Sequence, residues 1–145
     1  MILLDTNVLS EFMRVAPEPV VVTWLDGQPA ETVWVCAINR AEIELGSALL
    51  PEGRRKQGLS LQAQIMFEED FAGRCLPFDG AAASTYARIV AARTRAGSPI
   101  SVEDAQIAAI ALTNRLLMAT RNVHHFKEID GLDVHNPWNG AGMVR

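Results

Sequence analysis

The sequence of 145 residues contains few of the features that mark secreted or membrane proteins. It has only two cysteines, Cys36 and Cys75, and both lie in apolar runs. Two cysteines make no disulfide framework, so we expect buried, reduced thiols in a cytoplasmic protein. The apolar runs are too short and too interrupted to span a bilayer. The N-terminus has no basic start followed by a long apolar stretch, and we therefore expect no secretory signal.

The sequence also lacks an excess of positive charge. Its 13 lysines and arginines are outnumbered by 17 aspartates and glutamates, which gives a net charge of −4. This balance argues against tight, nonspecific nucleic-acid binding by phosphate neutralisation alone. A nucleic-acid enzyme is still compatible with it, because metal ions and a local basic patch can neutralise phosphates. The only compact basic run, Arg54-Arg55-Lys56, is either a solvated loop or a patch that contacts a nucleic-acid backbone.

The pattern of apolar residues predicts alternating strands and helices in one domain, residues 1–145. We expect strands at residues 2–4, 32–36, 74–78, 116–120 and 132–135. We expect helices at residues 5–13, near 22–25, and at 39–50, 59–71, 79–96 and 101–113, with a loop at 51–58. This alternation predicts an α/β fold with a short central parallel sheet of about four to five strands, flanked by helices on both faces.

Three acidic residues lie at points where an apolar run gives way to a helical pattern: Asp5, Glu42 and Asp104. In an open parallel α/β sheet such junctions converge on one crevice. Two carboxylates ~4 Å apart repel each other by about 4 kcal/mol at an effective dielectric constant near 20. A hard divalent cation is the usual way to neutralise such a group. The three acids therefore predict a metal-dependent hydrolase.

Each acid also has a structural explanation. The patterns Asn39-x-x-Glu42 and Ser101-x-x-Asp104 both match a capping box, and Asp5 can cap the first helix. A cap contributes about 0.5–2 kcal/mol, which is enough to explain any one of these residues alone. Their common position at strand-to-helix junctions favours the functional interpretation. It also makes Thr120, at the end of a further predicted strand, a fourth contributor.

Four short motifs carry a resemblance to a known family. They are Leu4-Asp5-Thr6-Asn7, Arg40-Ala41-Glu42-Ile43, Glu103-Asp104-Ala105-Gln106-Ile107-Ala108-Ala109 and Ala119-Thr120-Arg121-Asn122. In this order and spacing they resemble the motifs of PIN-domain ribonucleases, and in particular the VapC-type toxins of bacterial toxin–antitoxin pairs in the FitB-like branch. The resemblance extends over nearly the whole chain and implies a PIN-like fold.

The resemblance implies roles for individual residues. Asp5, Glu42 and Asp104 match the family's acidic metal ligands. Thr6 and Thr120 match hydroxyl residues that orient ligands or solvent, and Thr120 is counted with the catalytic group. Asn7 matches an asparagine that braces the first loop.

The fourth acid of the family is missing. Related sequences place an aspartate at one of two positions, which here hold Asn122 and His125. Asn122 still offers a neutral oxygen ligand for Mg²⁺ or Mn²⁺, whereas His125 suits Mn²⁺ better than Mg²⁺. With one negative charge fewer, we expect one well-held ion. Arg121 either holds a substrate phosphate or forms a structural ion pair, and we expect His124 and His125 to be loop residues.

The activity implied is metal-dependent endoribonuclease cleavage of RNA by an activated water, which leaves a 5′-phosphate. The implied partners are a VapB-type antitoxin and a second copy of the chain. Two alternatives stay open. One is a catalytically weakened member that mainly binds RNA or a partner, and the other is a phosphoacceptor receiver-like domain. The second fits poorly, because Asp5 has no acidic neighbour and the only lysines are Lys56 and Lys127.

Overall fold

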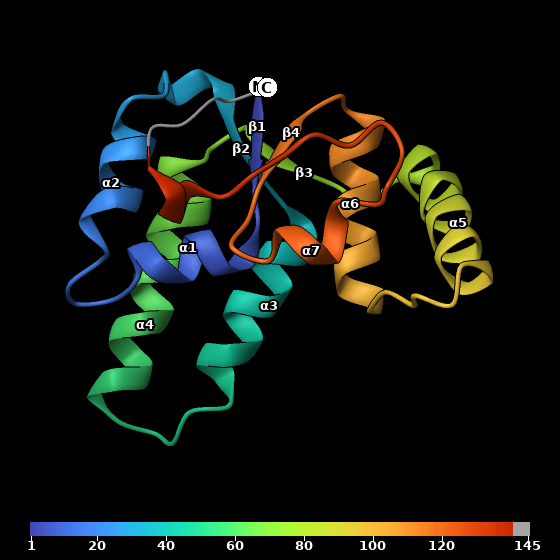
Figure 1. Ribbon diagram of the computed structural model, residues 1–145. Coiled ribbons are helices and arrows are strands. Elements are labelled where there is room, and N and C mark those ends of the chain that lie inside the picture. The colour runs from blue at the N-terminus through green and yellow to red at the C-terminus, as the bar shows by residue number, and fades with distance from the viewer. Residues whose placement is uncertain (141–145) are drawn as a thin grey trace.

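A computed structural model describes residues 1–140 and shows a parallel sheet between two layers of helices (Figure 1). The strands are β1 (Ile2–Leu4), β2 (Val33–Cys36), β3 (Cys75–Leu76), β4 (Leu117–Ala119) and β5 (Val134–His135). The helices are α1 (Thr6–Phe12), α2 (Pro19–Asp26), α3 (Ala37–Ala48), α4 (Arg54–Ile65), α5 (Gly80–Arg95), α6 (Val102–Thr113) and α7 (Val123–Phe126). The predicted α/β fold with about four to five parallel strands is confirmed.

The strands are short and apolar because both faces of the sheet are buried. Successive side chains of a strand point to opposite faces. In β1, Leu3 packs into the core on the side of α5 and α6. Ile2 and Leu4 pack into the second core together with apolar residues of α1 and α2. Figure 1 shows these two helix layers on opposite sides of the sheet.

The order of the strands creates a crevice at the centre of the sheet. That order is β3-β2-β1-β4-β5, so the chain builds outward from β1 in one direction and then crosses to its other side. Ligand sites in open parallel sheets lie at the carboxyl ends of the strands, at the point where the strand order reverses. Asp5 directly follows β1 and Thr120 directly follows β4, which are paired neighbours.

The start of α3 differs from the prediction. Asn39 was expected to cap this helix, but Cys36 is the N-cap and Asn39 lies in the first turn. The Asn39 side-chain oxygen accepts a hydrogen bond of 2.8 Å from the Cys36 backbone N–H, so the amide closes the helix end from inside. Glu42 therefore lies in the second turn, and the predicted Asn39–Glu42 capping box is wrong.

Two further boundaries differ. Helix α4 begins at Arg54, so much of the predicted 51–58 loop is helical and Gly58 lies inside the helix. An interior glycine costs about 1 kcal/mol relative to alanine, which the neighbouring helix-forming residues tolerate. His124 and His125 lie in α7, which the sequence pattern did not reveal and which the buried Phe126 anchors. Within residues 1–140, no helix combines the length and apolarity needed to cross a bilayer.

Candidate active site

Asp5 is the most deeply buried of the three acids, with 5% of its surface exposed. One carboxylate oxygen accepts a hydrogen bond of 2.8 Å from the Thr6 backbone N–H. The other accepts hydrogen bonds from the Thr120 hydroxyl at 2.7 Å and from the Asn7 side-chain amide at 3.3 Å. Burial raises the pKa of Asp5 to about 6, and the negative charges of Asp104 and Glu42 add to the rise. Asp5 is thus an acid whose charge the fold itself does not fully stabilise.

Glu42 reaches the same point from α3. The Thr6 hydroxyl donates a hydrogen bond of 2.6 Å to Glu42 Oε1. The same hydroxyl accepts a hydrogen bond of 3.0 Å from the amide nitrogen of Asn39, which is fully buried. Thr6 therefore contacts Asp5 through its backbone and Glu42 through its side chain. Sequence reasoning missed the part of Asn39 in this network because its position near the helix start was explained as a cap.

Thr120 and Asn7 join the loops that follow β1 and β4. Thr120 is fully buried, and its hydroxyl accepts hydrogen bonds from Asn7 Nδ2 at 3.3 Å and from the Asn122 backbone N–H at 3.1 Å. Asn7 Oδ1 in turn accepts a hydrogen bond of 3.2 Å from the Arg121 backbone N–H. The two loops consequently hold Asp5 from both sides.

Asp104 lies in the first turn of α6 and makes a different contact from the one that a capping box requires. Ser101 is the N-cap, and its hydroxyl accepts a hydrogen bond of 3.2 Å from the Asp104 backbone N–H. The Asp104 carboxylate, however, lies 3.1 Å from Nδ1 of His125. Within residues 1–140 no reciprocal bond from Asp104 to the Ser101 backbone is formed. Helix capping therefore explains the presence of Ser101. It does not explain the Asp104 carboxylate, which contacts His125 instead.

Arg121 and Asn122, the two residues after Thr120, lie in different surroundings. The Arg121 guanidinium lies 4.9 Å from the ring centre of Trp138, in a cation–π contact. Asn122 is half-buried at the start of α7, and its side chain does not cap that helix. Of the two candidates for the missing acid, His125 contacts Asp104 directly, whereas the Asn122 amide stays available for another ligand.

The donor set fits a hard divalent cation. Asp5, Glu42 and Asp104 supply oxygen atoms, and within residues 1–140 neither Asp5 nor Glu42 forms an ion pair. In the same part of the chain, no three histidine, cysteine, aspartate or glutamate side chains already have the spacing of a metal site. An ion held by all three acids would require their side chains to move closer together than in this structure.

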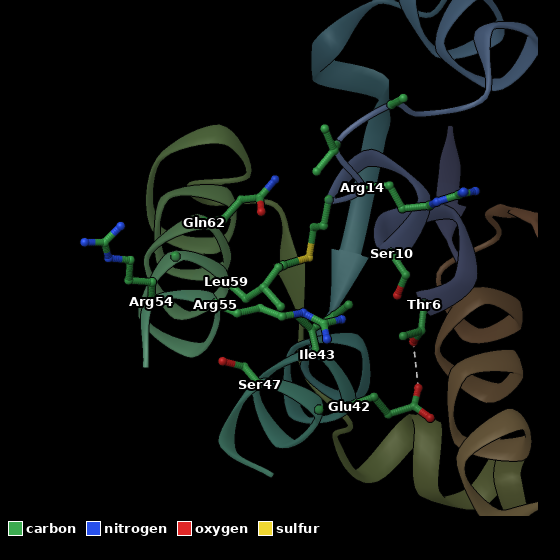
Figure 2. A pocket seen from close by; sticks show the side chains of 15 residues that line it. Thr6, Ser10, Arg14, Glu42, Ile43, Ser47, Arg54, Arg55, Leu59 and Gln62 are labelled. Carbon is green, nitrogen blue, oxygen red and sulfur yellow. Dashed lines mark hydrogen bonds between the residues drawn. The ribbon is translucent and has the colours of Figure 1, made fainter. Parts of the chain in front are cut away.

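A groove of about 880 Å³ runs from Glu42, the one of the three acids that lines it, between α1, α3 and α4. Thr6 and Glu42 lie along it, together with three basic residues, Arg14, Arg54 and Arg55. Figure 2 shows the Arg55 side chain extending toward Ile43 and the Thr6 side of the groove, whereas Arg54 points away from it. Positive charge therefore lies close to an otherwise acidic site.

The fold and the site together define an α/β protein with three carboxylates near the crevice of a parallel sheet, an arrangement suited to metal-dependent hydrolysis. Comparison with known proteins gives the family. Residues 2–132 match the family model described as PIN domain, and the chain belongs to the PIN-domain family.

Two curated relatives are similar over almost their whole length. The chain is 39% identical to VapC ribonuclease Y4jK of Sinorhizobium fredii, over 97% of this chain and 100% of the relative. It is 43% identical to Toxin FitB of Neisseria gonorrhoeae, over 96% and 99%. A solved structure of FitAB bound to an IR36 DNA fragment contains a chain that is 41% identical, with a TM-score of 0.89, over 100% of this chain and 99% of that one.

Proposed function

We propose that this chain is the toxin of a toxin–antitoxin pair and cleaves RNA as an endoribonuclease that depends on Mg²⁺ or Mn²⁺. Family membership supports nuclease activity, and the names of the VapC and FitB relatives support the role as a toxin. The observation that carries the proposal is the buried Asp5 carboxylate, flanked by the charges of Glu42 and Asp104. A divalent cation near Asp5 would offset the cost of burying this carboxylate in its charged form beside two other negative charges.

In this proposal Asp5, Glu42 and Asp104 hold the metal, and the Asn122 carbonyl oxygen takes the place of the missing acid. A bound divalent ion would lower the pKa of the water that it binds and would stabilise the negative charge that develops on the phosphate. Because His125 Nδ1 faces Asp104, we assign this nitrogen to orienting the carboxylate rather than to ligating the ion.

The hydroxyl residues orient the carboxylates. Thr120 donates to Asp5 and Thr6 donates to Glu42, so each hydrogen bond fixes one oxygen and leaves the other lone pairs free for a ligand. Asn7 and Asn39 fix these hydroxyls in turn. These hydrogen bonds reduce the reorientation that the Asp5 and Glu42 carboxylates must undergo when a ligand binds.

Arg55 is the groove arginine that we expect to bind RNA phosphates, whereas Arg14 already forms an ion pair of 3.1 Å with Glu11. Both line the groove that contains Thr6 and Glu42. Arg55 forms no ion pair within residues 1–140, so its guanidinium is available for a phosphate. We expect Arg121 to act at the other side of Asp5, supported by its contact with Trp138. Such a local patch compensates for the acidic overall charge.

The partners that we propose are a VapB-type antitoxin and a second copy of the chain, both in the cytoplasm. The similarity to a FitAB structure bound to DNA supports a cognate antitoxin. The Ala-rich helices α5 and α6 pack against each other within the chain. The outer face of α5 stays exposed at Ala83 and Ala87. A stable monomer in sedimentation equilibrium would contradict the homodimer.

The experiment that tests the activity is RNA cleavage in Mn²⁺ and in Mg²⁺ by the chain and its Asp104→Asn variant. The variant keeps the size and the backbone cap of Asp104, so we expect an intact fold and loss of cleavage. Glu103→Gln is the matched control, since Glu103 is the exposed neighbour and its loss should leave cleavage unchanged. Cleavage by Asp104→Asn at the parental rate would refute the assignment.

The second candidate is a weakened member that binds RNA or a partner without cutting. It is favoured by Asn122, which stands where the resemblance to PIN-domain ribonucleases implies an acid. The same assay separates the two functions: a binding module would retain RNA in a gel shift and show no metal-dependent cleavage by the parent chain.

A further inference from the structure

Arg93 is a buried arginine for which the proposed function gives no explanation. It lies in the last turn of α5, and only 8% of its surface is exposed. Arginine is rarely buried unless it is paired. Within residues 1–140, however, none of the ion pairs includes Arg93. Its charge is instead accommodated by neutral oxygen atoms.

Those oxygen atoms belong to two separate segments. Arg93 Nε donates a hydrogen bond of 2.7 Å to the Ser98 carbonyl, and Nη2 lies 3.4 Å from the Ser98 hydroxyl. Arg93 Nη1 donates a hydrogen bond of 2.8 Å to the carbonyl of His125 in α7. One rigid guanidinium thus joins the turn between α5 and α6 to α7.

Both segments are connected to the contact between Asp104 and His125 at the acidic site. Ser98 lies three residues before Ser101, the cap of the helix that carries Asp104. His125 places its Nδ1 at 3.1 Å from Asp104 Oδ2. Arg93 therefore holds the backbone on both sides of the Asp104–His125 pair without contacting either side chain of that pair.

We propose that Arg93 is a positioning residue of the active site: it fixes the backbone of His125 so that the imidazole orients the Asp104 carboxylate. The inference rests on the proposed nuclease function and adds to the active site a buried residue that holds His125 in position. The planar fork of arginine can reach two carbonyl groups at fixed angles, whereas the single ammonium group of lysine cannot do so with the same geometry. Outer partners of metal-binding side chains typically change activity by about 10- to 100-fold when removed.

The test is a double-mutant cycle on RNA cleavage with Arg93→Met, His125→Ala and the combined variant. Methionine fills much of the same volume and removes all five donors. We expect Arg93→Met to lower kcat by about 10-fold or more, in the range for outer partners of a metal site, with little change in KM. In the His125→Ala background the same substitution should have no further effect. Arg95→Met is the matched control, because Arg95 is exposed in the same turn of α5, and it should retain parental activity.

Full activity of a folded Arg93→Met variant would overturn the proposal, as would independent, multiplying effects of Arg93→Met and His125→Ala. If Arg93→Met does not fold, Arg93→Lys takes its place in the cycle with the same criteria.

A second measurement does not depend on nuclease activity. In metal-free protein, Asp104→Asn should shift the NMR signal of the His125 ring when Arg93 is present and should shift it much less in the Arg93→Met or Arg93→Lys background. Equal shifts in both backgrounds would overturn the role of Arg93. Absence of cleavage by the parent chain would count against the proposed function alone, because this NMR comparison would still decide the positioning role.

Discussion

The Asp5 carboxylate combines deep burial, three hydrogen bonds and two negative neighbours. The hydrogen bonds from Thr120 and Thr6 lower its pKa, but burial raises the pKa by more and brings it to about 6. An ionised Asp5 is therefore less favourable in the folded chain than in the unfolded chain. A residue that served only to cap α1 would not need this burial.

This cost predicts how stability depends on pH in metal-free protein. The pKa of Asp5 rises from 3.8 to about 6 on folding. Between these values the folded state binds more protons, so stability falls as the pH rises from about 4 to 6, and the full penalty applies above that range. Asp5→Asn removes the charge and should be more stable than the parent at pH 7, by less than the about 3 kcal/mol that the shift corresponds to, because an amide cannot accept all the hydrogen bonds from Thr6, Thr120 and Asn7. Urea unfolding in the presence of a chelator measures the difference.

The control for this prediction is again Glu103→Gln, which removes a charge from an exposed position and should change stability little at either pH. The gain from Asp5→Asn should shrink as the pH falls from about 6 to 4 and disappear near about pH 3, below both pKa values, where the parent carboxyl is protonated in both states. A variant that is less stable than the parent at pH 7 would show that Asp5 stabilises the fold and is not held at a cost to stability.

At the scale of elements, α4 carries the groove arginines in an unfavourable place. Its first turn contains Arg54 and Arg55, no acidic residue and no side-chain cap. Positive charges at a helix N-terminus are disfavoured by the helix dipole, by about 0.3–1 kcal/mol each. Two arginines here cost helix stability, which indicates that they serve another purpose.

The two arginines form a matched pair for a test of RNA binding. Because Arg55 extends into the groove and Arg54 points away, Arg55→Ala should weaken RNA binding more than Arg54→Ala (Figure 2). It should also reduce the slope of log affinity against log salt concentration by about 1. Binding of a labelled RNA to the cleavage-deficient Asp104→Asn background at several salt concentrations gives both values. Equal losses for the two variants would argue for diffuse attraction and against an RNA path through the groove.

The elements were largely predictable because their signals are local. The apolar strands, the cap at Asp79 and the end of α5 at Gly97, with φ of +72°, all follow from short-range patterns. Helix α7 was missed because four residues carry too little periodicity, and it forms through the burial of Phe126. The start of α4 was missed because Gly53 and Gly58 together indicated a loop.

The candidate site was predictable only in part. Asp5 and Glu42 stood out because they follow strands, and the crevice where strands converge is a property of the sheet. Asp104 lies in α6, which follows α5 and not a strand, so the predicted strand-to-helix junction is wrong for this acid. Asn39 and Arg93 were not predictable, since their partners lie 33 and 32 residues away along the chain. Nothing in a single sequence indicates which buried polar side chains will meet. The family's functional residues therefore came from the resemblance, and their supports came from the fold.

At the scale of the whole molecule, the acids are placed by the strand order, in which the chain adds β2 and β3 on one side of β1 and β4 and β5 on the other. Asp5 and Thr120 come from paired central strands, Glu42 comes from the helix after β2, and Asp104 comes from the helix before β4. These residues span about a hundred positions of the chain. The negative charges of Asp104 and Glu42 nevertheless both raise the pKa of Asp5. The central claim is that these three acids make one metal site.

Calorimetric titration of Mn²⁺ into metal-free protein tests this claim most directly. One negative charge fewer than in the family pattern leaves room for a single well-held ion, so we predict one ion per chain. Asp5→Asn, Glu42→Gln and Asp104→Asn should each weaken its binding by about 10-fold or more, while Glu103→Gln should not. Two equally tight ions per chain, or parental affinity in any of the three acid variants, would contradict the account.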